Sequence, residues 1–273
     1  MNNLRMYCLT MEPSHEKMIL ELGYHPVGLG DKNFSNKFFS DKSENNISKK
    51  NPYYGEYTFH YWLWKNQLDK MGSEWIGFCQ YRKFFTEYKV SEKNISFKNL
   101  CGAVLKNIPK ELDNYDSFIG EPFYINQFRF SKFIKRNFYK MISNPSLIFF
   151  KNKRNIKFHF DMWHGSGNLE SAIDLIEGDD REEFRHYVNS KVYFSPHNMF
   201  ICKKSTLKKY YEAVLPWLNR CESLFGFEDL KGYGLKRIYG FLAERYLSFW
   251  FKKNTRYKEM PIFFKDLSDF SEL

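Results

Sequence analysis

The sequence lacks the features that would place this chain within or across a membrane. No stretch approaches the roughly 20 uninterrupted apolar residues that a transmembrane helix needs. The N-terminal segment Met1–Arg5 has no apolar core of the kind found in signal peptides. Cysteines number five, are widely spaced, and show neither C-x-x-C pairs nor a nearby His cluster, which argues against disulfides and against a zinc site. We therefore expect a cytoplasmic protein with reduced cysteines.

Repeats, low-complexity tracts and the composition of a disordered chain are also missing. Aromatic residues make up 20% of the sequence and charged residues 27%, which is typical of a globular protein with a large aromatic core. A chain of 273 residues can form one large domain, or one domain carrying a sizeable insertion. We favour the second arrangement.

Hydrophobic periodicity predicts alternating strands and helices in the first half of the chain. Such β-α-β alternation favours an α/β fold with a mainly parallel sheet. Ser14 is expected to cap the first helix, and the segment 28–50 to be a loop. The expected strands are 5–10, 74–82, 115–120, 192–202 and 257–264, and the expected helices are 54–67, 98–112, 168–177, 181–190, 205–224 and 236–252.

Basic residues exceed acidic ones by 42 to 32, and they concentrate in one segment. Between Gln127 and Phe160 there are nine Lys or Arg residues and no Asp or Glu, interleaved with Phe and Tyr. This pattern is expected of a segment that rests on anionic lipid headgroups, and it predicts a protein peripheral to the inner face of the cytoplasmic membrane. The same pattern would suit single-stranded nucleic acid, where aromatic side chains stack on bases among cations.

Three ordered blocks carry a resemblance to a known family. Glu56–Asn66 reads E-x-T-x-x-Y-W-x-W-K-N, the segment ending at Arg82 reads G-x-x-Q-Y-R, and His197–Lys204 is followed by Arg237–Arg245. In order and spacing these blocks resemble a family of bacterial capsular and exopolysaccharide glycosyltransferases long catalogued as a domain of unknown function.

The resemblance implies a fold and an activity. It implies a GT-A-like core that binds a nucleotide sugar, with a UDP-sugar as donor and galactofuranose or a related hexose as the transferred group. The acceptor would be a capsular polysaccharide or lipopolysaccharide, lipid-linked, and nucleic acid would not be a partner. We expect residues 1–126 to form the nucleotide-sugar-binding half, 127–160 the basic aromatic helical insertion, and 161–273 the acceptor side with the C-terminal helices.

Residues at the end of the strand 74–82 are expected to hold the donor, because ligands bind at the carboxyl ends of strands in open α/β sheets. Arg82 can pair with a diphosphate through its planar fork of donors, or bridge to a nearby carboxylate. Gln80 stands where many relatives carry His, which excludes an imidazole proton shuttle there but leaves an amide for a sugar hydroxyl. The full expected set is Gln80, Tyr81, Arg82, His197, Asn198, Arg237 and Arg245.

Carboxylates and one histidine are candidates for the chemical step. Sugar transfer with inversion needs a base for the acceptor hydroxyl, and a cation or a donor group that stabilises the departing diphosphate. Glu56 lies among aromatic residues, where a carboxylate is either a base or a buried ion-pair partner. We expect the aromatic helix over 54–67, which carries Glu56, and the strand end at Arg82 to form the walls of one pocket for a sugar diphosphate. His164 is followed by two glycines whose backbone N–H groups are expected to be available to an anion. The candidates are Glu56, Asp161, His164 and Glu244, although a buried salt bridge is the favoured role for at least one of Glu244 and Arg245.

The sequence also lacks a recognisable motif for a divalent cation. Many GT-A enzymes hold Mn or Mg with an Asp-x-Asp at the end of a strand, since hard oxygen ligands suit these ions. No such motif follows the strand at 75–79, and Asp179–Asp180 is expected to cap the next helix. We therefore expect metal-independent use of the UDP-sugar. The alternatives are a nucleic-acid-binding protein and a non-catalytic subunit of a polysaccharide assembly complex.

Overall fold

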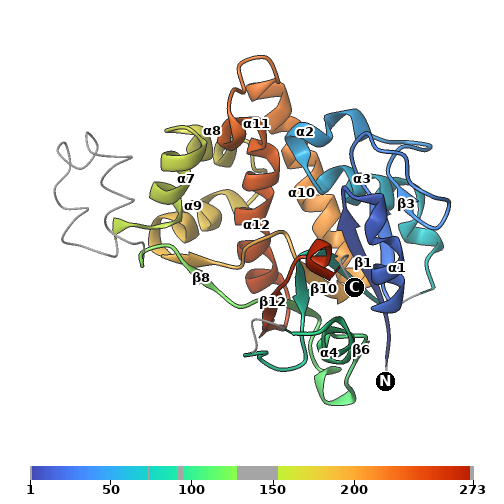
Figure 1. The fold of residues 1–273 in the computed structure, drawn as a ribbon. Coiled ribbons are helices and arrows are strands. Elements are labelled where there is room, and N and C mark those ends of the chain that lie inside the picture. The colour runs from blue at the N-terminus through green and yellow to red at the C-terminus, as the bar shows by residue number, and fades with distance from the viewer. Residues whose placement is uncertain (1, 73, 92–94, 128–152, 271–273) are drawn as a thin grey trace.

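A mixed sheet forms the centre of the computed structural model, which describes residues 2–72, 74–91, 95–127 and 153–270 (Figure 1). The principal strand order is β11-β7-β10-β4-β1-β2-β3, with β5, β6 and β12 attached at its margins and β8 pairing with β9 separately. The strands are β1 Asn2–Thr10, β2 His25–Gly28, β3 Phe39–Ser40, β4 Trp75–Gln80, β5 Lys83–Phe85, β6 Asn107–Ile108, β7 Ser117–Gly120, β8 Phe123–Tyr124, β9 Tyr193–Phe194, β10 Phe200–Lys203, β11 Tyr257–Met260 and β12 Ile262–Phe264.

Four neighbouring strands of the sheet run in the same direction. β1 pairs in parallel with β2 on one side and with β4 on the other, and β2 pairs in parallel with β3. The chain therefore leaves β1 toward β2 and β3, then returns to the opposite side of β1 as β4. This change of side creates a topological switch point beside the carboxyl ends of β1 and β4, the place where open α/β sheets bind ligands.

Alternating side chains give the sheet a core on each face. Along β1, Met6 and Cys8 belong to one hydrophobic cluster, whereas Tyr7 and Leu9 belong to the other. Because successive side chains of a strand point to opposite faces, the strand is buried on both. The two-sided burial explains why β1 reads as a nearly continuous apolar run.

Helices pack on both faces, and the larger group gathers on one side of the molecule, around α12 (Figure 1). The long helices α10 and α12 contact each other, and α3 packs on α10. The helices are α1 Glu16–Glu21, α2 Asn51–Tyr54, α3 Tyr57–Asn66, α4 Phe97–Ala103, α7 Ile156–His164, α8 Asn168–Asp174, α9 Asp180–Ser190, α10 Lys204–Phe225, α11 Tyr233–Lys236 and α12 Ile238–Asn254.

Several local predictions were wrong in detail. Ser14 lies inside a 3₁₀ turn, Pro13–His15, and caps no helix. The helix expected over 98–112 ends at Ala103, after which the chain forms the short strand β6. Asp179 is the N-cap residue of α9 but its side chain accepts no capping hydrogen bond. Contacts with the sheet decide the conformation of these segments, and local sequence propensity does not include those contacts.

The basic aromatic segment is described only at its ends, because residues 128–152 lie outside the described part. Its last residues join the folded core: Arg154 is 6% exposed and Phe160 is fully buried. The helix α7 also continues past the predicted boundary at residue 160 to His164. Membrane association of the remainder of 127–160 stays a prediction. Among the described residues, no helix is both long and apolar enough to cross a membrane.

Candidate active site

A small cavity of about 110 Å³ opens at the switch point of the sheet. Thr10 at the end of β1 and Gln80 at the end of β4 line it, together with Glu56 and Arg82. Arg237, just before α12, closes another wall. The structure thus brings the aromatic helix and the Gln-Tyr-Arg strand end to one cavity, as the sequence predicted.

Glu56 is the centre of a hydrogen-bond network at this cavity. Its Oε1 accepts from Gln80 Nε2 at 3.3 Å and from Asn198 Nδ2 at 3.0 Å, and its Oε2 accepts from Arg237 at 3.2 Å. The side chain of Glu56 is only 12% exposed. A buried carboxylate is stable when several donors surround it, so this arrangement fixes four predicted site residues relative to one another.

Gly55 makes the close approach of Arg237 possible. Its φ of +58° is a conformation that L side chains rarely adopt, and a Cβ built there would lie 2.3 Å from the Arg237 guanidinium. The chain therefore needs glycine immediately before Glu56 for the ion pair between Glu56 and Arg237 to form.

Arg82 lines the small cavity and Lys83 lies beside it, next to Gln80. Arg82 and Lys83 take part in none of the ion pairs that the described residues form, and the Arg82 guanidinium lies 5.2 Å from the centre of the Tyr81 ring. Lys83 Nζ donates to Gln80 Oε1 at 3.0 Å and lies 3.1 Å from His197 Nδ1. Burial and the neighbouring Arg82 lower the pKa of Lys83. The site carries a local excess of positive charge.

Lys83 is a site residue that the sequence prediction missed. The available signal was its place directly after Gln80-Tyr81-Arg82, but residue 83 begins β5 and its side chain could equally have pointed away from the cavity. The tight turn between β4 and β5 directs Lys83 back toward Gln80.

A turn with two left-handed residues joins the small cavity to helix α12. His197 and Asn198 have φ angles of +80° and +52°, values that are uncommon for residues other than glycine. His197 donates its backbone N–H to Glu244 Oε1, and its carbonyl accepts from Gln80 Nε2 at 3.1 Å. Asn198 Nδ2 also donates to the Gly240 carbonyl at 3.1 Å. These hydrogen bonds hold the strained turn in place.

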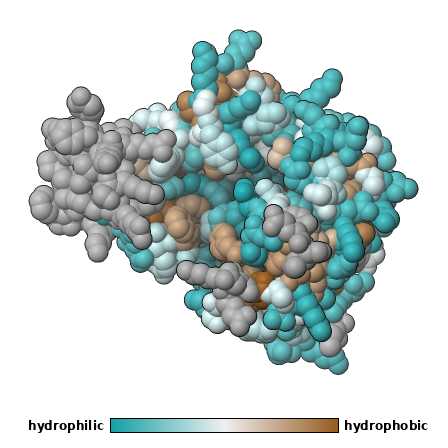
Figure 2. Space-filling model, viewed as in Figure 1, coloured by the Kyte–Doolittle hydropathy of each residue, from teal (hydrophilic) through white to brown (hydrophobic). Residues whose placement is uncertain are grey.

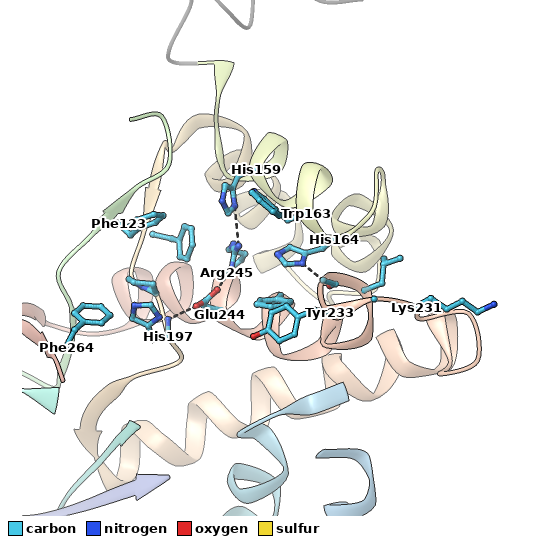
Figure 3. A pocket seen from close by; sticks show the side chains of 16 residues that line it. Phe123, His159, Trp163, His164, His197, Lys231, Tyr233, Glu244, Arg245 and Phe264 are labelled. Carbon is cyan, nitrogen blue, oxygen red and sulfur yellow. Dashed lines mark hydrogen bonds and ion pairs between the residues drawn. The ribbon is translucent and has the colours of Figure 1, made fainter. Parts of the chain in front are cut away.

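A second cavity of about 800 Å³ lies on the other side of this turn. The molecule is hollowed near the middle of the face shown in Figure 2, and hydrophobic residues form part of the hollow. Figure 3 shows Glu244 and Arg245 at the floor, with His197 on one side and His164 on the other. The ring of His197 therefore belongs to the wall that separates the two cavities.

Arg245 does not reach the small cavity. It is 2% exposed, pairs with Glu244, and stacks at 4.0 Å over the ring of Phe194. Its guanidinium also lies 3.3 Å from His159 Nδ1. Glu244 and Arg245 therefore form the buried ion pair that the sequence favoured for at least one of them.

Two of the three histidines that line the large cavity, His164 and His197, are neutral at ordinary pH. Burial lowers the pKa of His164 to about 3, with a further contribution from Arg245. Burial, Lys83 and Arg82 lower the pKa of His197 to about 3. His164 donates its Nδ1–H to the Gly234 carbonyl at 2.9 Å, which fixes the orientation of its ring.

Asp161 lines neither cavity. It pairs with Lys157 at 2.7 Å, and its Oδ1 accepts the Gly167 N–H at 3.1 Å. The expectation that this N–H would be available to an anion was wrong, because Asp161 occupies it. Asp161 instead ties the end of α7 to the start of α8.

Potential metal ligands do not cluster in the described part of the chain. No group of three or more His, Cys, Asp or Glu side chains there is arranged to hold a metal ion. Asp180, half of the acidic pair at 179–180, pairs with Lys253 and accepts from Tyr246. The charged residues that line the small cavity are Arg82, Arg237 and the single carboxylate Glu56.

Comparisons with known proteins agree with the fold. Two solved structures match: the bifunctional glycosyltransferase WbbM in its apo form, and core-mannan synthase A from Aspergillus fumigatus in a Mn/GDP form. WbbM aligns with a TM-score of 0.70 at 18% identity over 97% of this chain and 45% of its own, so this chain spans less than half of WbbM. The mannan synthase aligns at a TM-score of 0.37 and 10% identity over 92% and 70%. The predicted GT-A-like α/β fold with a mainly parallel sheet is confirmed.

A comparison with models of protein families shows which family the chain belongs to. No curated protein matches it. A family model described as a domain of unknown function, DUF4422, matches residues 7–255, which include Glu56, Arg82 and Glu244. The chain therefore belongs to the DUF4422 family.

Proposed function

We propose that this protein is a glycosyltransferase that moves a hexose, such as galactofuranose, from a UDP-sugar to a capsular polysaccharide or lipopolysaccharide acceptor. The observation that carries the proposal is a pair of cations that form no ion pair with a described carboxylate, Arg82 in the lining of the small cavity and Lys83 beside it, at the switch point of a GT-A-like sheet. A diphosphate supplies the missing negative charge, and an arginine fork can bind two of its oxygens.

The residues of the small cavity divide into binding and positioning groups. Arg82 and Lys83 bind the diphosphate and stabilise the charge that develops on it as the bond to the sugar breaks. Glu56 positions Gln80, Asn198 and Arg237 through its three hydrogen bonds. Because Glu56 lines the small cavity assigned to the donor, and not the large cavity where an acceptor can enter, it serves the geometry of the site.

Glu244 is the base in this proposal. It lines the large cavity, where an acceptor can enter, and it is tied to the turn that also holds Gln80. As the acceptor oxygen attacks the anomeric carbon, its proton passes to the Glu244 carboxylate and the diphosphate leaves with the bonding electrons. His164 and His197 remain neutral and orient neighbouring groups.

The proposal is tested by titrating UDP into the purified protein in a calorimeter. Arg82→Ala and Lys83→Ala should each weaken UDP binding at least tenfold, roughly the effect of one charge-assisted contact. Lys17→Ala is the matched control, because the Lys17 side chain is 88% exposed and lies on α1 outside the lining of the cavity. Absence of UDP binding by the unmodified protein, or equal binding by all three variants, would remove the proposed donor site.

Attachment to an anionic membrane surface is the remaining part of the proposal. Its support is the run of basic and aromatic residues between Gln127 and Phe160. Deletion of residues 128–152 should abolish sedimentation with vesicles of phosphatidylglycerol while UDP binding persists. Unchanged sedimentation would contradict a membrane role for this segment.

A further inference from the structure

The large cavity gathers most of the exposed aromatic surface of the described residues. Six Phe, Tyr or Trp side chains are well exposed in the described part of the chain. Four of them line the cavity, namely Phe123, Trp163, Tyr233 and Phe264, whereas Tyr88 and Tyr124 do not. Exposed aromatic side chains that converge on one cavity mark a binding site, since their apolar faces otherwise remain in contact with water.

The floor of the cavity is polar but carries no net charge. Glu244 and Arg245 neutralise each other as an ion pair, and His164 and His197 are uncharged at neutral pH. Lys231, the remaining cation of the lining, points away from the cavity in Figure 3. An ionic ligand would therefore lose its hydration here without gaining an opposite charge.

A long alkyl chain is a poor occupant for the same reason. Filling the cavity with hydrocarbon would cover the Glu244 carboxylate and the imidazoles of His164 and His197 with groups that cannot form hydrogen bonds. A sugar ring satisfies both parts of the surface, because it has flat apolar patches of C–H groups and a rim of hydroxyls. Aromatic side chains can cover the first, and Glu244 and the imidazoles can bond to the second.

The position of the cavity fits the second substrate of a transfer reaction. The ring of His197 lines it, the His197 Nδ1 lies 3.1 Å from Lys83 Nζ, and the His197 carbonyl holds Gln80 at the small cavity. A sugar in the large cavity would thus lie next to a nucleotide sugar in the small one. Glu244 would face its hydroxyls.

We propose that the large cavity binds the terminal sugar of the glycan acceptor, and that this sugar is uncharged. The inference rests on the proposed function, and it adds the substrate class of the second cavity. Trp163 and Tyr233 contact the faces of the sugar ring. The acceptor sugar is a neutral hexose, and the cavity excludes uronic acids.

The test measures binding of short glycosides below their micelle concentrations, by calorimetry and by saturation-transfer NMR. The probes are octyl β-D-galactopyranoside, octyl β-D-glucopyranoside, octyl β-D-glucuronide and the sugar-free surfactant octyl tetraethylene glycol ether. At least one of the two neutral glycosides should bind, and the glucuronide should bind at least tenfold more weakly. A surfactant that binds as tightly as the neutral glycosides, or a glucuronide of equal affinity, would overturn the proposal.

Variants locate the binding on the cavity. Trp163→Ala and Tyr233→Ala should each weaken the neutral glycoside about two- to tenfold, the effect of one aromatic contact. Both side chains are exposed, at 37% and 71%, so their removal leaves the core packed. Tyr88→Ala is the matched control, because Tyr88 is 60% exposed and lies outside the cavity. Equal affinities in all three variants would place the glycoside elsewhere.

UDP titration separates the two proposals. A protein that binds UDP but neither neutral glycoside refutes the assignment of the large cavity and leaves the donor site intact. A protein that binds no UDP loses the function on which the assignment rests.

Discussion

His60 should make the folded protein sensitive to mild acid. It lies fully buried in α3, where its Nδ1 shares a hydrogen bond of 2.7 Å with the Tyr211 hydroxyl. Its Nε2 has no hydrogen-bond partner in the described part of the chain, and the ring of Phe78 lies 4.4 Å away. Protonation would place a charge and a second N–H donor in this apolar surrounding. Burial accordingly lowers the pKa of His60 from 6.5 to about 3.

The direction in which stability changes with pH follows from proton binding in the folded and unfolded states. Between pH 6.5 and 3 the unfolded chain binds a proton at His60 that the folded chain does not. The stability that neutral His60 contributes is therefore complete above about pH 7 and falls as the pH decreases. At pH 5 the loss from this one residue is about 2 kcal/mol relative to pH 8.

Urea unfolding of the unmodified protein and of His60→Gln, each at pH 8 and pH 5, isolates this effect. Gln can still bond to the Tyr211 hydroxyl but does not titrate, and any packing defect it causes is the same at both pH values. The unmodified protein should lose about 2 kcal/mol more than the variant, a midpoint difference of roughly 0.7 M urea for a slope of about 3 kcal/mol per M. Equal losses in the two proteins would refute the reasoning, because they would assign the acid sensitivity to other groups.

Two further predictions concern the walls of the site. Glu56→Gln and Arg237→Gln should each destabilise the fold by about 1–2 kcal/mol, because each substitution leaves one partner of a largely buried ion pair without the other. Urea unfolding of the two single variants and of the double variant checks this. Strictly additive losses would show that the two side chains do not interact. Gly234→Ala should lower the thermal unfolding midpoint by several degrees, because a Cβ there would lie 2.2 Å from the Trp163 carbonyl oxygen, at a cost of about 1–3 kcal/mol. Gly72→Ala is the control, because a Cβ at residue 72 would meet no atom within 4 Å. Equal midpoints for the two variants would contradict the clash.

The sequence predicted the meeting of Glu56 and Arg82 because the rule behind it is topological. Parallel strands end at one edge of a sheet, so Gln80 and Arg82 had to lie near the end of β1. Helix α3 then needed only to pack beside that edge to bring Glu56 there. The helices expected over 168–177, 181–190, 205–224 and 236–252 were also predicted within three residues at each end, since their apolar periods are long. The single strand expected over 192–202 was wrong, because the turn at His197 and Asn198 divides it into β9 and β10.

The large cavity could not be predicted in the same way. Its walls come from segments as far apart as Phe123, Trp163, Tyr233 and Phe264, and no local pattern shows that these aromatic side chains face one another. The position of Asp161 outside both cavities could not be predicted for a related reason. Its partners Lys157 and Gly167 are close in sequence, but only the turn after α7 decides which N–H group the carboxylate reaches.

Helix α12 sets the spacing between the two cavities. Arg237 is the N-cap residue of α12 beside the small cavity, and Glu244 follows seven residues later beside the large one. Two turns of helix separate the two side chains along the axis by about 10 Å and return them to nearly the same angular position. Inserting a single residue between them would rotate Glu244 by about 100° and move it away from the large cavity, even though every contacting side chain is retained.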